Sequence, residues 1–92
     1  MPLAIVIPAY NTQASLDRVL GEIPDYLRSG VIVIDDGSDT PIQATDVRLI
    51  RHPENLGYGA AQKTGYDAAI EMGAERVVLL HGDGQYATED VL

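Results

Sequence analysis

The chain has 92 residues, enough for one small domain, and it carries a formal net charge of −8 and no cysteine. The lack of cysteine excludes a disulfide framework and a thiolate metal site, and the negative charge argues against direct binding of nucleic acid or of an anionic membrane surface. No apolar run approaches the roughly 20 residues that a membrane-spanning helix needs, so we expect a cytoplasmic chain with no membrane segment of its own.

Residues 3–7 (LAIVI) form a short apolar run that predicts a first strand. This strand ends in a turn-prone segment that contains Pro8, Tyr10 and Asn11. The ring of Tyr10 offers a surface on which a nucleobase can stack. A lone tyrosine in a loop is more often only partly buried, so both interpretations stay open.

Apolar residues at helical spacing follow, and they predict an amphipathic helix with one apolar side: Leu16, Val19, Leu20, Ile23 and Leu27. Pro24 lies within this pattern. We therefore expect the helix to kink or end near Ile23, with Leu27 in a last irregular turn.

Residues 31–34 (VIVI) predict a second strand that is buried on both faces and stops at Asp35 and Asp36, followed by Gly37 and Ser38. On a continuing strand the two carboxylates would point to opposite faces, so we expect them to have different roles. The ordinary alternative is a polar turn that only ends the strand.

Residues 47–51 alternate in polarity, as expected of a strand near the edge of a sheet. His52 follows in a loop, has no partner in the sequence and is assigned no function. A second helix is expected over about 58–72, with Gly73 as its stop. Its inner face is made of small residues, which favours close approach to the sheet: Ala60, Ala61, Thr64, Gly65, Ala68 and Ala69.

Glycines precede the second helix. Gly57 and Gly59 can present backbone N–H groups to a phosphate or a ribose, and Lys63, one turn inside the helix, can add positive charge. The alternative is that Gly59 only allows tight packing where the helix begins and that Lys63 is a solvated surface residue.

Residues 76–80 predict a last strand, followed by His81, Asp83 and Gln85 at alternating positions. On an extended backbone these three side chains share a face. Their oxygen and nitrogen donors suit Mg²⁺ or Mn²⁺ on a diphosphate, and such a cation would offset the negative charge of the chain. A polar loop with a solvated Asp83 is the competing interpretation.

The predicted order of elements is β-α-β-β-α-β, which implies an α/β fold with a mostly parallel sheet. The carboxyl ends of parallel strands share one edge, where open α/β sheets bind ligands. We therefore expect the segments 10–11, 35–36 and 81–85 to converge on one site.

Four segments together, 5–11 (IVIPAYN), 33–38 (VIDDGS), 55–59 (NLGYG) and 82–85 (GDGQ), resemble the family 2 glycosyltransferases of GT-A fold. The resemblance is greatest to the transferases that act on dolichol or polyprenyl phosphates, and it covers almost the whole chain. It implies that residues 1–92 are the nucleotide-sugar-binding part of such an enzyme, the Rossmann-like half of the fold.

The resemblance also implies roles for individual residues. Asp36 is expected to accept a hydrogen bond from a ring N–H of the base, and Asp35 to support the loop or the ribose. The residues expected at the nucleotide sugar are Pro8, Tyr10, Asn11, Asp35, Asp36, Gly57, Lys63 and Asp83.

By the same resemblance, Asp83 is the last acid of the family's Asp-x-Asp motif and binds a divalent metal, Mg²⁺ or Mn²⁺, with Gln85 also within reach. His81 stands where the family has the first Asp. Its imidazole could ligate manganese or hydrogen-bond to ribose, but the loss of one negative charge should weaken magnesium binding.

The expected reaction is inverting, metal-assisted transfer of a sugar from a UDP- or GDP-linked donor to a polyprenyl phosphate or a saccharide. The general base is expected beyond Leu92, so we expect this chain alone to bind nucleotide with negligible turnover. The whole protein is then expected at the inner face of a membrane.

Two other functions compete with this one. A stand-alone nucleotide-binding or regulatory module could use the acidic pair as receiver domains do, although the third strand runs into Arg51, His52 and Pro53 rather than into a phosphorylatable Asp. An exposed edge of the sheet could also pair with a second copy to form a homo-oligomer.

Overall fold

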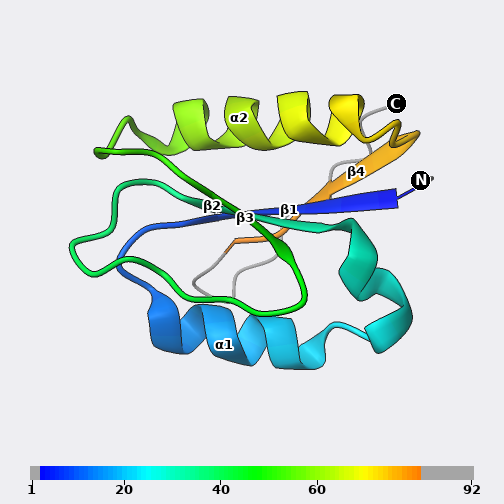
Figure 1. The fold of residues 1–92 in the computed structure, drawn as a ribbon, viewed down its shortest axis with the longest axis horizontal. Coiled ribbons are helices and arrows are strands. Elements are labelled where there is room, and N and C mark those ends of the chain that lie inside the picture. Colours follow the sequence, from blue (N-terminus) through cyan, green and yellow to red (C-terminus); the bar gives the residue numbers. More distant parts are fainter. Residues whose placement is uncertain (1–2, 82–92) are drawn as a thin grey trace.

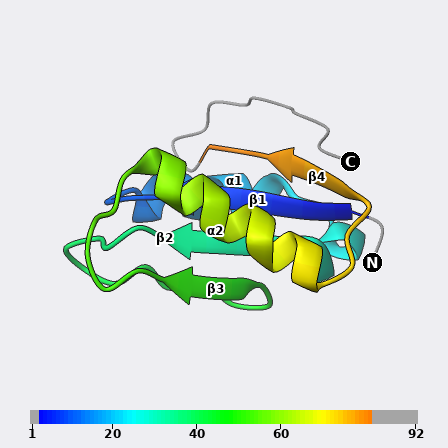
Figure 2. The ribbon, with the colours of Figure 1, turned by 90° about the horizontal axis from the view of Figure 1, so that it is seen from above.

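Four parallel strands form one sheet in the order β3-β2-β1-β4, with one α-helix on each face (Figures 1 and 2). The computed structural model describes residues 3–81. The elements are β1 (Leu3–Ala9), α1 (Gln13–Glu22), the 3₁₀ helix η1 (Asp25–Gly30), β2 (Val31–Asp35), β3 (Arg48–Arg51), α2 (Tyr58–Glu71) and β4 (Arg76–Leu79). The predicted α/β class, element order and parallel sheet are confirmed.

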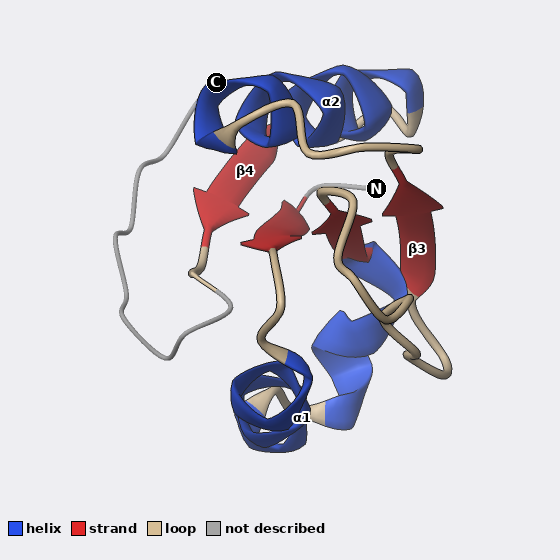
Figure 3. Cartoon of the chain, turned by 90° about the vertical axis from the view of Figure 1, so that its left-hand side faces the viewer, coloured by secondary structure: helices blue, strands red, loops and turns tan. Residues whose placement is uncertain are grey.

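The central strands β1 and β2 are buried almost throughout, because a helix covers each face of the sheet (Figure 3). Successive side chains alternate between the faces: Ile5 and Ile7 join the core under α1, whereas Ala4 and Val6 join the core under α2. The outer strand β3 is mostly exposed, which confirms that the alternating segment 47–51 lies at an edge.

On one face, α1 buries Leu16, Val19 and Leu20 against the sheet. The helix ends at Glu22, and the backbone is extended at Ile23, just before Pro24. Leu27 is carried by η1 and packs at the border of this core. The predicted effect of the proline is therefore confirmed.

On the other face, α2 approaches the sheet closely through small buried residues, Ala61, Gly65, Ala68 and Ala69. A Cβ atom placed on Gly65 would lie only 2.2 Å from Cγ1 of Val6. The predicted small inner face of this helix is thus confirmed, and it sets the spacing between helix and sheet. None of the helices within residues 3–81 is long and apolar enough to cross a membrane.

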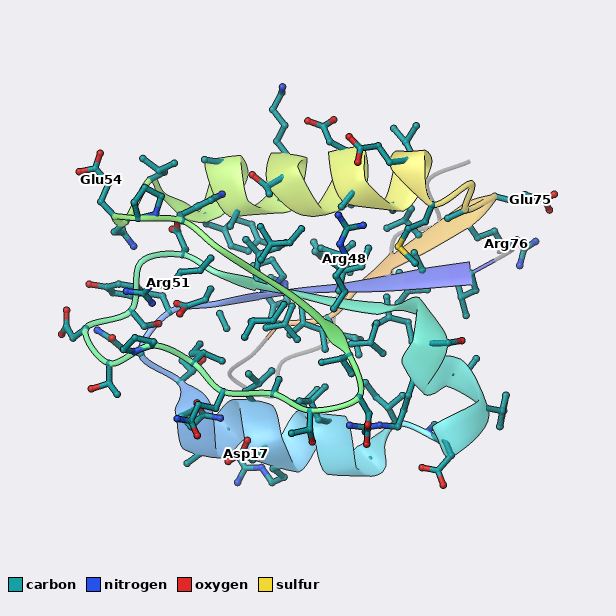
Figure 4. All side chains as sticks on the ribbon, in the orientation of Figure 1. Asp17, Arg48, Arg51, Glu54, Glu75 and Arg76 are labelled. Carbon is teal, nitrogen blue, oxygen red and sulfur yellow. The ribbon has the colours of Figure 1, made fainter. Side chains whose placement is uncertain are left out.

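All four strands point the same way, so their carboxyl ends lie at one end of the molecule (Figure 2). Figure 4 shows Arg51 and Glu54 at this end, and Glu75 and Arg76 at the opposite end. The polar residues that follow the strands are thereby brought together.

Candidate functional site

The adjacent carboxylates of Asp35 and Asp36 point to opposite faces of the sheet, as predicted. Asp35 continues the alternation of Val33, which belongs to the core under α1, and Asp36 continues that of Ile34, which belongs to the core under α2. The hydrogen bonding between β1 and β2 continues one residue beyond β2, because the Asp36 N–H donates to the Ala9 carbonyl at 2.9 Å.

Asp35 is fully buried and ties down the loop after β2. Its Oδ1 accepts the Ser38 N–H at 2.9 Å, and its Oδ2 accepts the Ile42 N–H at 2.9 Å and a hydrogen bond from Arg51. Burial alone would raise the pKa of Asp35, but hydrogen bonds from Ser38, Ile42 and Arg51 hold it below its ordinary value. Of the two roles expected for Asp35, this geometry supports the loop rather than the ribose.

Asp36 is only 3% exposed, and donors surround its carboxylate. Oδ1 accepts hydrogen bonds from Nδ1 of His52 at 2.7 Å and from the Leu56 N–H at 3.0 Å. Oδ2 accepts the Gly57 N–H at 2.9 Å and Nδ2 of Asn55 at 3.2 Å. Burial alone would raise the pKa of Asp36, but the bonds from His52, Leu56 and Gly57 lower it below its ordinary value.

These bonds fill the approximately four lone-pair positions that a carboxylate offers. A further donor must therefore displace one of them. The amide of Asn55 is the natural one to leave, because its contact is the longest and the same Nδ2 is shared with the Asp36 carbonyl, also at 3.2 Å.

His52 is a functional candidate that the sequence did not indicate. It is 8% exposed, and its Nε2 lies 2.8 Å from Oγ1 of Thr64, opposite the Asp36 bond. Its partners are 16 and 12 residues away in the chain, so no local pattern reveals them. The usable signal was positional: His52 follows the third strand, whose carboxyl end lies at the same edge as the others.

Glycines allow the loops after β2 and β3 to meet. Gly37 has φ +72°, and a Cβ on it would lie 2.3 Å from the carbonyl carbon of Glu54 and 2.4 Å from the nitrogen of Asn55. Gly57 has φ +101°, where side chains are disfavoured, and this conformation directs its N–H to Asp36. Without these glycines the Asp36 carboxylate could not be enclosed in this way.

A cleft of about 290 Å³ opens beside Asp36, between the carboxyl ends of β1 and β4 and the start of α2. Its lining residues are Pro8, Ala9, Tyr10, Thr12, Asp36, Asn55, Gly57, Tyr58, Ala61 and His81. The expected convergence of strand ends is thus confirmed for Tyr10, Asp36 and His81. Within residues 3–81, the buried Oγ1 of Thr12, a residue of this lining, has no hydrogen-bond partner.

His81 and Tyr58 form one part of this lining. Their rings stack with centroids 5.3 Å apart and an interplanar angle of 16°, and His81 Nε2 lies 3.5 Å from the Tyr58 hydroxyl. Asp83 and Gln85 lie outside the described residues, so the metal site stays a prediction. Among the residues that are described, no three His, Cys, Asp or Glu side chains cluster as metal ligands would.

Besides the buried Asp35, two expected site residues are not brought to the cleft. The side chain of Lys63 is 80% exposed, and its Nζ lies 3.7 Å from Oδ2 of Asp67. The side chain of Asn11 donates to Oδ2 of Asp39 at 3.3 Å and accepts the Asp39 N–H at 2.9 Å, and the Asn11 N–H donates to Oγ of Ser38 at 2.9 Å. Asn11 therefore joins the loops after β1 and β2, and neither residue lines the cleft.

A larger groove of about 660 Å³ lies between α1 and segment 40–45, and we refer to it as the α1-side groove. Two of its long polar side chains already have partners: Gln13 pairs with the backbone of Gln43 through both side-chain atoms, and Arg28 donates to the carbonyls of Leu20 and Thr45. No residue that the sequence assigns to a nucleotide lines it. The smaller cleft is therefore the better candidate site.

Comparison with known proteins gives a match to the sequence model described as "Glycosyl transferase family 2", over residues 4–92. A UDP-N-acetylglucosamine--dolichyl-phosphate N-acetylglucosaminyltransferase of Methanococcus voltae is 28% identical over 95% of this chain and 43% of its own length. A dolichyl-phosphate beta-glucosyltransferase of Trichomonas vaginalis is 27% identical over 96% of this chain and 32% of its own length. For a polyprenol monophosphomannose synthase of Mycolicibacterium smegmatis, the values are 26%, 95% and 37%. The chain thus spans less than half the length of these relatives.

Proposed function

The chain belongs to glycosyl transferase family 2, and from this premise we propose that the cleft beside Asp36 binds the nucleotide of a nucleoside-diphosphate sugar. One observation carries the proposal: three strand ends bring Tyr10, Asp36 and His81 to a single cleft. This is the edge at which open parallel sheets bind ligands. The cleft offers an aromatic surface, a carboxylate and backbone groups, which together suit a nucleoside.

The base is recognised through Asp36. Its Oδ2 accepts a ring N–H, of the kind that uracil and guanine carry, in place of the weakly held Asn55 amide. Tyr10 is 42% exposed, and its ring can stack on the base, with Pro8 also in the lining. A UDP- or GDP-linked donor is therefore the proposed class.

The diphosphate needs positive charge, because the chain carries a net charge of −8. We assign this role to Mg²⁺ or Mn²⁺ held by Asp83 and Gln85, with His81 as a nitrogen ligand or as a donor to ribose. The donor set, one carboxylate, one amide oxygen and one imidazole, suits Mn²⁺ better than Mg²⁺. Such a cation, when bound, neutralises charge on the departing nucleoside diphosphate.

In the whole protein, the proposed reaction is transfer of the sugar with inversion to a polyprenyl phosphate or a saccharide. The printed names of the relatives, which include dolichyl-phosphate and polyprenol enzymes, support the first of these acceptors. The residues of the cleft then act on the donor side, by binding and orienting the nucleotide. The general base that deprotonates the acceptor is proposed to lie outside residues 3–81. We also propose that the whole enzyme works at the cytoplasmic face of a membrane.

The phospho-acceptor alternative is less compatible with the site. Asp35 and Asp36 are both almost fully buried, and every oxygen of their carboxylates accepts hydrogen bonds. Phosphorylation would turn one of these oxygens into an ester oxygen and weaken the backbone hydrogen bonds by which each carboxylate holds its loop. Pairing of copies through the edge strand β3 remains a separate proposal, and the apparent mass in size-exclusion chromatography tests it.

Thermal unfolding with nucleoside diphosphates tests the proposed function. We expect UDP or GDP to raise the melting temperature when Mn²⁺ is present, whereas CDP and ADP, whose bases lack the ring N–H, have little effect. A ligand at ten times its Kd stabilises by about 1.4 kcal/mol, which corresponds to about 6–11 °C in a chain of this size.

Two tyrosines provide the matched variants for this experiment. Tyr10→Ala should abolish most of the shift, while Tyr26→Ala should keep it, because Tyr26 is 81% exposed on η1 and does not line the cleft. If no nucleotide shifts the melting temperature of the unmodified chain, the proposal is wrong.

A further inference from the structure

We propose that His52 is a positioning residue for the nucleotide cleft, acting through Asp36 rather than by touching the ligand. The inference rests on the proposed function and adds a residue to it. His52 does not line the cleft, yet its ring links the cleft carboxylate to the middle of α2. An edge strand can end without a buried imidazole that has a hydrogen-bond partner on each nitrogen, so we infer a further role for His52.

The backbone places His52 beside its partner. The His52 N–H donates to the Asp35 carbonyl at 2.9 Å, which continues the β2–β3 ladder one residue beyond β3. Because Asp36 follows Asp35, the imidazole and the carboxylate come to lie on the same face of the sheet. Their 2.7 Å contact is thus built by strand register.

Nδ1 of His52 must carry a hydrogen, since an ionised carboxylate only accepts hydrogen bonds. Nε2 pairs with Oγ1 of Thr64, which also lies 3.0 Å from the Ala60 carbonyl. The hydroxyl can donate to either neighbour, so Thr64 holds the ring whether Nε2 carries a hydrogen or not. In each case the donor toward Asp36 is fixed.

This donor sets the plane of the Asp36 carboxylate. Oδ1 is held by His52 and by the Leu56 N–H, so Oδ2 is left on the side of Gly57 and Asn55, which line the cleft. Oδ2 is the oxygen that we propose accepts the hydrogen bond from the nucleobase. Without His52 the carboxylate can rotate, and both the base acceptor and the segment 55–57 lose their alignment.

Arg51 provides an internal comparison. It precedes His52 and bonds to Asp35 as His52 bonds to Asp36, but neither Arg51 nor Asp35 lines the cleft. A variant at Arg51 should therefore lower the stability of the fold through its buried partner without changing the affinity of the folded chain for nucleotide.

The test compares His52→Leu, His52→Asn and Arg51→Met by calorimetric titration with UDP and GDP in the presence of Mn²⁺. Leucine keeps much of the ring volume and removes both ring nitrogens, including the Nδ1 donor, while asparagine places an amide nitrogen where Nδ1 stands. We expect His52→Leu to weaken binding about tenfold or more, His52→Asn to stay within about threefold of the unmodified chain, and Arg51→Met to bind like it. Denaturation in urea should show that all three variants lose stability.

The outcomes separate the claims. If affinity falls equally in His52→Leu and His52→Asn, or not at all in His52→Leu, the positioning role is wrong while the proposed function stands. If the unmodified chain binds no nucleotide, the proposed function fails and the role of His52 fails with it.

A spectroscopic measurement on the unmodified chain covers the case in which His52→Leu does not fold. The Nδ1–H proton of His52 should be visible by NMR and should shift when nucleotide saturates the chain, because a new donor on Oδ2 weakens the other bonds of the carboxylate. A resonance that does not move on saturation would overturn the proposal.

Discussion

Two neighbouring and chemically identical carboxylates, Asp35 and Asp36, have different surroundings on the two faces of the sheet. On the α1 face, Asp35 is enclosed by Ser38, Ile42 and Arg51 and lines no cleft. On the α2 face, Asp36 is also enclosed by donors, but it lines the cleft, and we propose that the base displaces its longest contact, the Asn55 amide. The face of the strand on which each acid lies thus decides whether it lines the cleft.

The helices differ in the same sense. Large residues of α1, Leu16, Val19 and Leu20, fill the space above their face of the sheet. The inner residues of α2 are alanine and glycine, and Ala61 forms part of the lining of the cleft. A small side chain at this position leaves room for a ligand where a leucine would fill it.

The largest expected effect is on the α1 face. Asp35→Asn replaces an acceptor with an amide that meets either a backbone N–H or Arg51, so a buried charge-assisted network is broken. We expect the free energy of unfolding in urea to fall by about 3–5 kcal/mol. A loss below about 1 kcal/mol would show that Asp35 is not the anchor of its loop.

One added methyl group tests the close approach of α2 to the sheet. Gly65→Ala should destabilise the chain by about 1–3 kcal/mol despite the better helix propensity of alanine, because the added Cβ meets Val6. Its control is Gly59→Ala, in the same helix but with open space around the added atom, which should stabilise by up to about 1 kcal/mol. Equal effects of the two changes, measured by urea denaturation, would contradict the close approach of α2.

Low pH should lower the stability of the chain through the carboxylates on both faces of the sheet, Asp35 and Asp36. The folded pKa values of Asp35 and Asp36 lie below the unfolded value of about 3.9, so their contribution is fully present above that pH and is lost as the pH falls through the folded values. We expect the free energy of unfolding to vary little through these groups between about pH 7 and 5 and to drop below about pH 4. Asp35→Asn and Asp36→Asn should each flatten that drop in part, and a drop unchanged in both variants would rule these groups out.

The smallest expected effect concerns the hydrogen bond from Asn55 to Asp36, which we propose the base replaces. Asn55→Ala should cost only about 0.5–1.5 kcal/mol of stability, because the amide makes long, shared contacts. Nucleotide affinity should stay the same or rise a few-fold, since the base no longer competes with the amide for Oδ2. A tenfold loss of affinity in calorimetric titration would mean that Asn55 itself binds the ligand.

The sequence predicted those features that have local signals. The apolar run 31–34 indicated a strand buried on both faces, Pro24 marked the end of α1, and strand alternation separated the roles of Asp35 and Asp36. These follow from residue type and spacing alone. The parallel sheet followed from the alternation of strands and helices.

Features that depend on distant contacts were not predictable in the same way. The order β3-β2-β1-β4 and the contacts of His52 join segments that the sequence does not link. Lys63, which the resemblance placed at the nucleotide, does not line the cleft, because it stands two positions after the buried Ala61 and so lies nearly on the opposite side of the helix. Helical phase, applied to single residues, would have excluded it from the cleft.

We propose that the cleft beside Asp36, and not the larger α1-side groove, is the ligand site. Titration of the ¹⁵N-labelled chain with UDP and GDP in the presence of Mn²⁺, followed by amide chemical shifts, tests it most directly. We expect the largest shifts at the amides of Tyr10, Leu56 and Gly57, with little change at Gln43 and Thr45 of the α1-side groove. Shifts concentrated at Gln43 and Thr45, or none at saturating nucleotide, would contradict it.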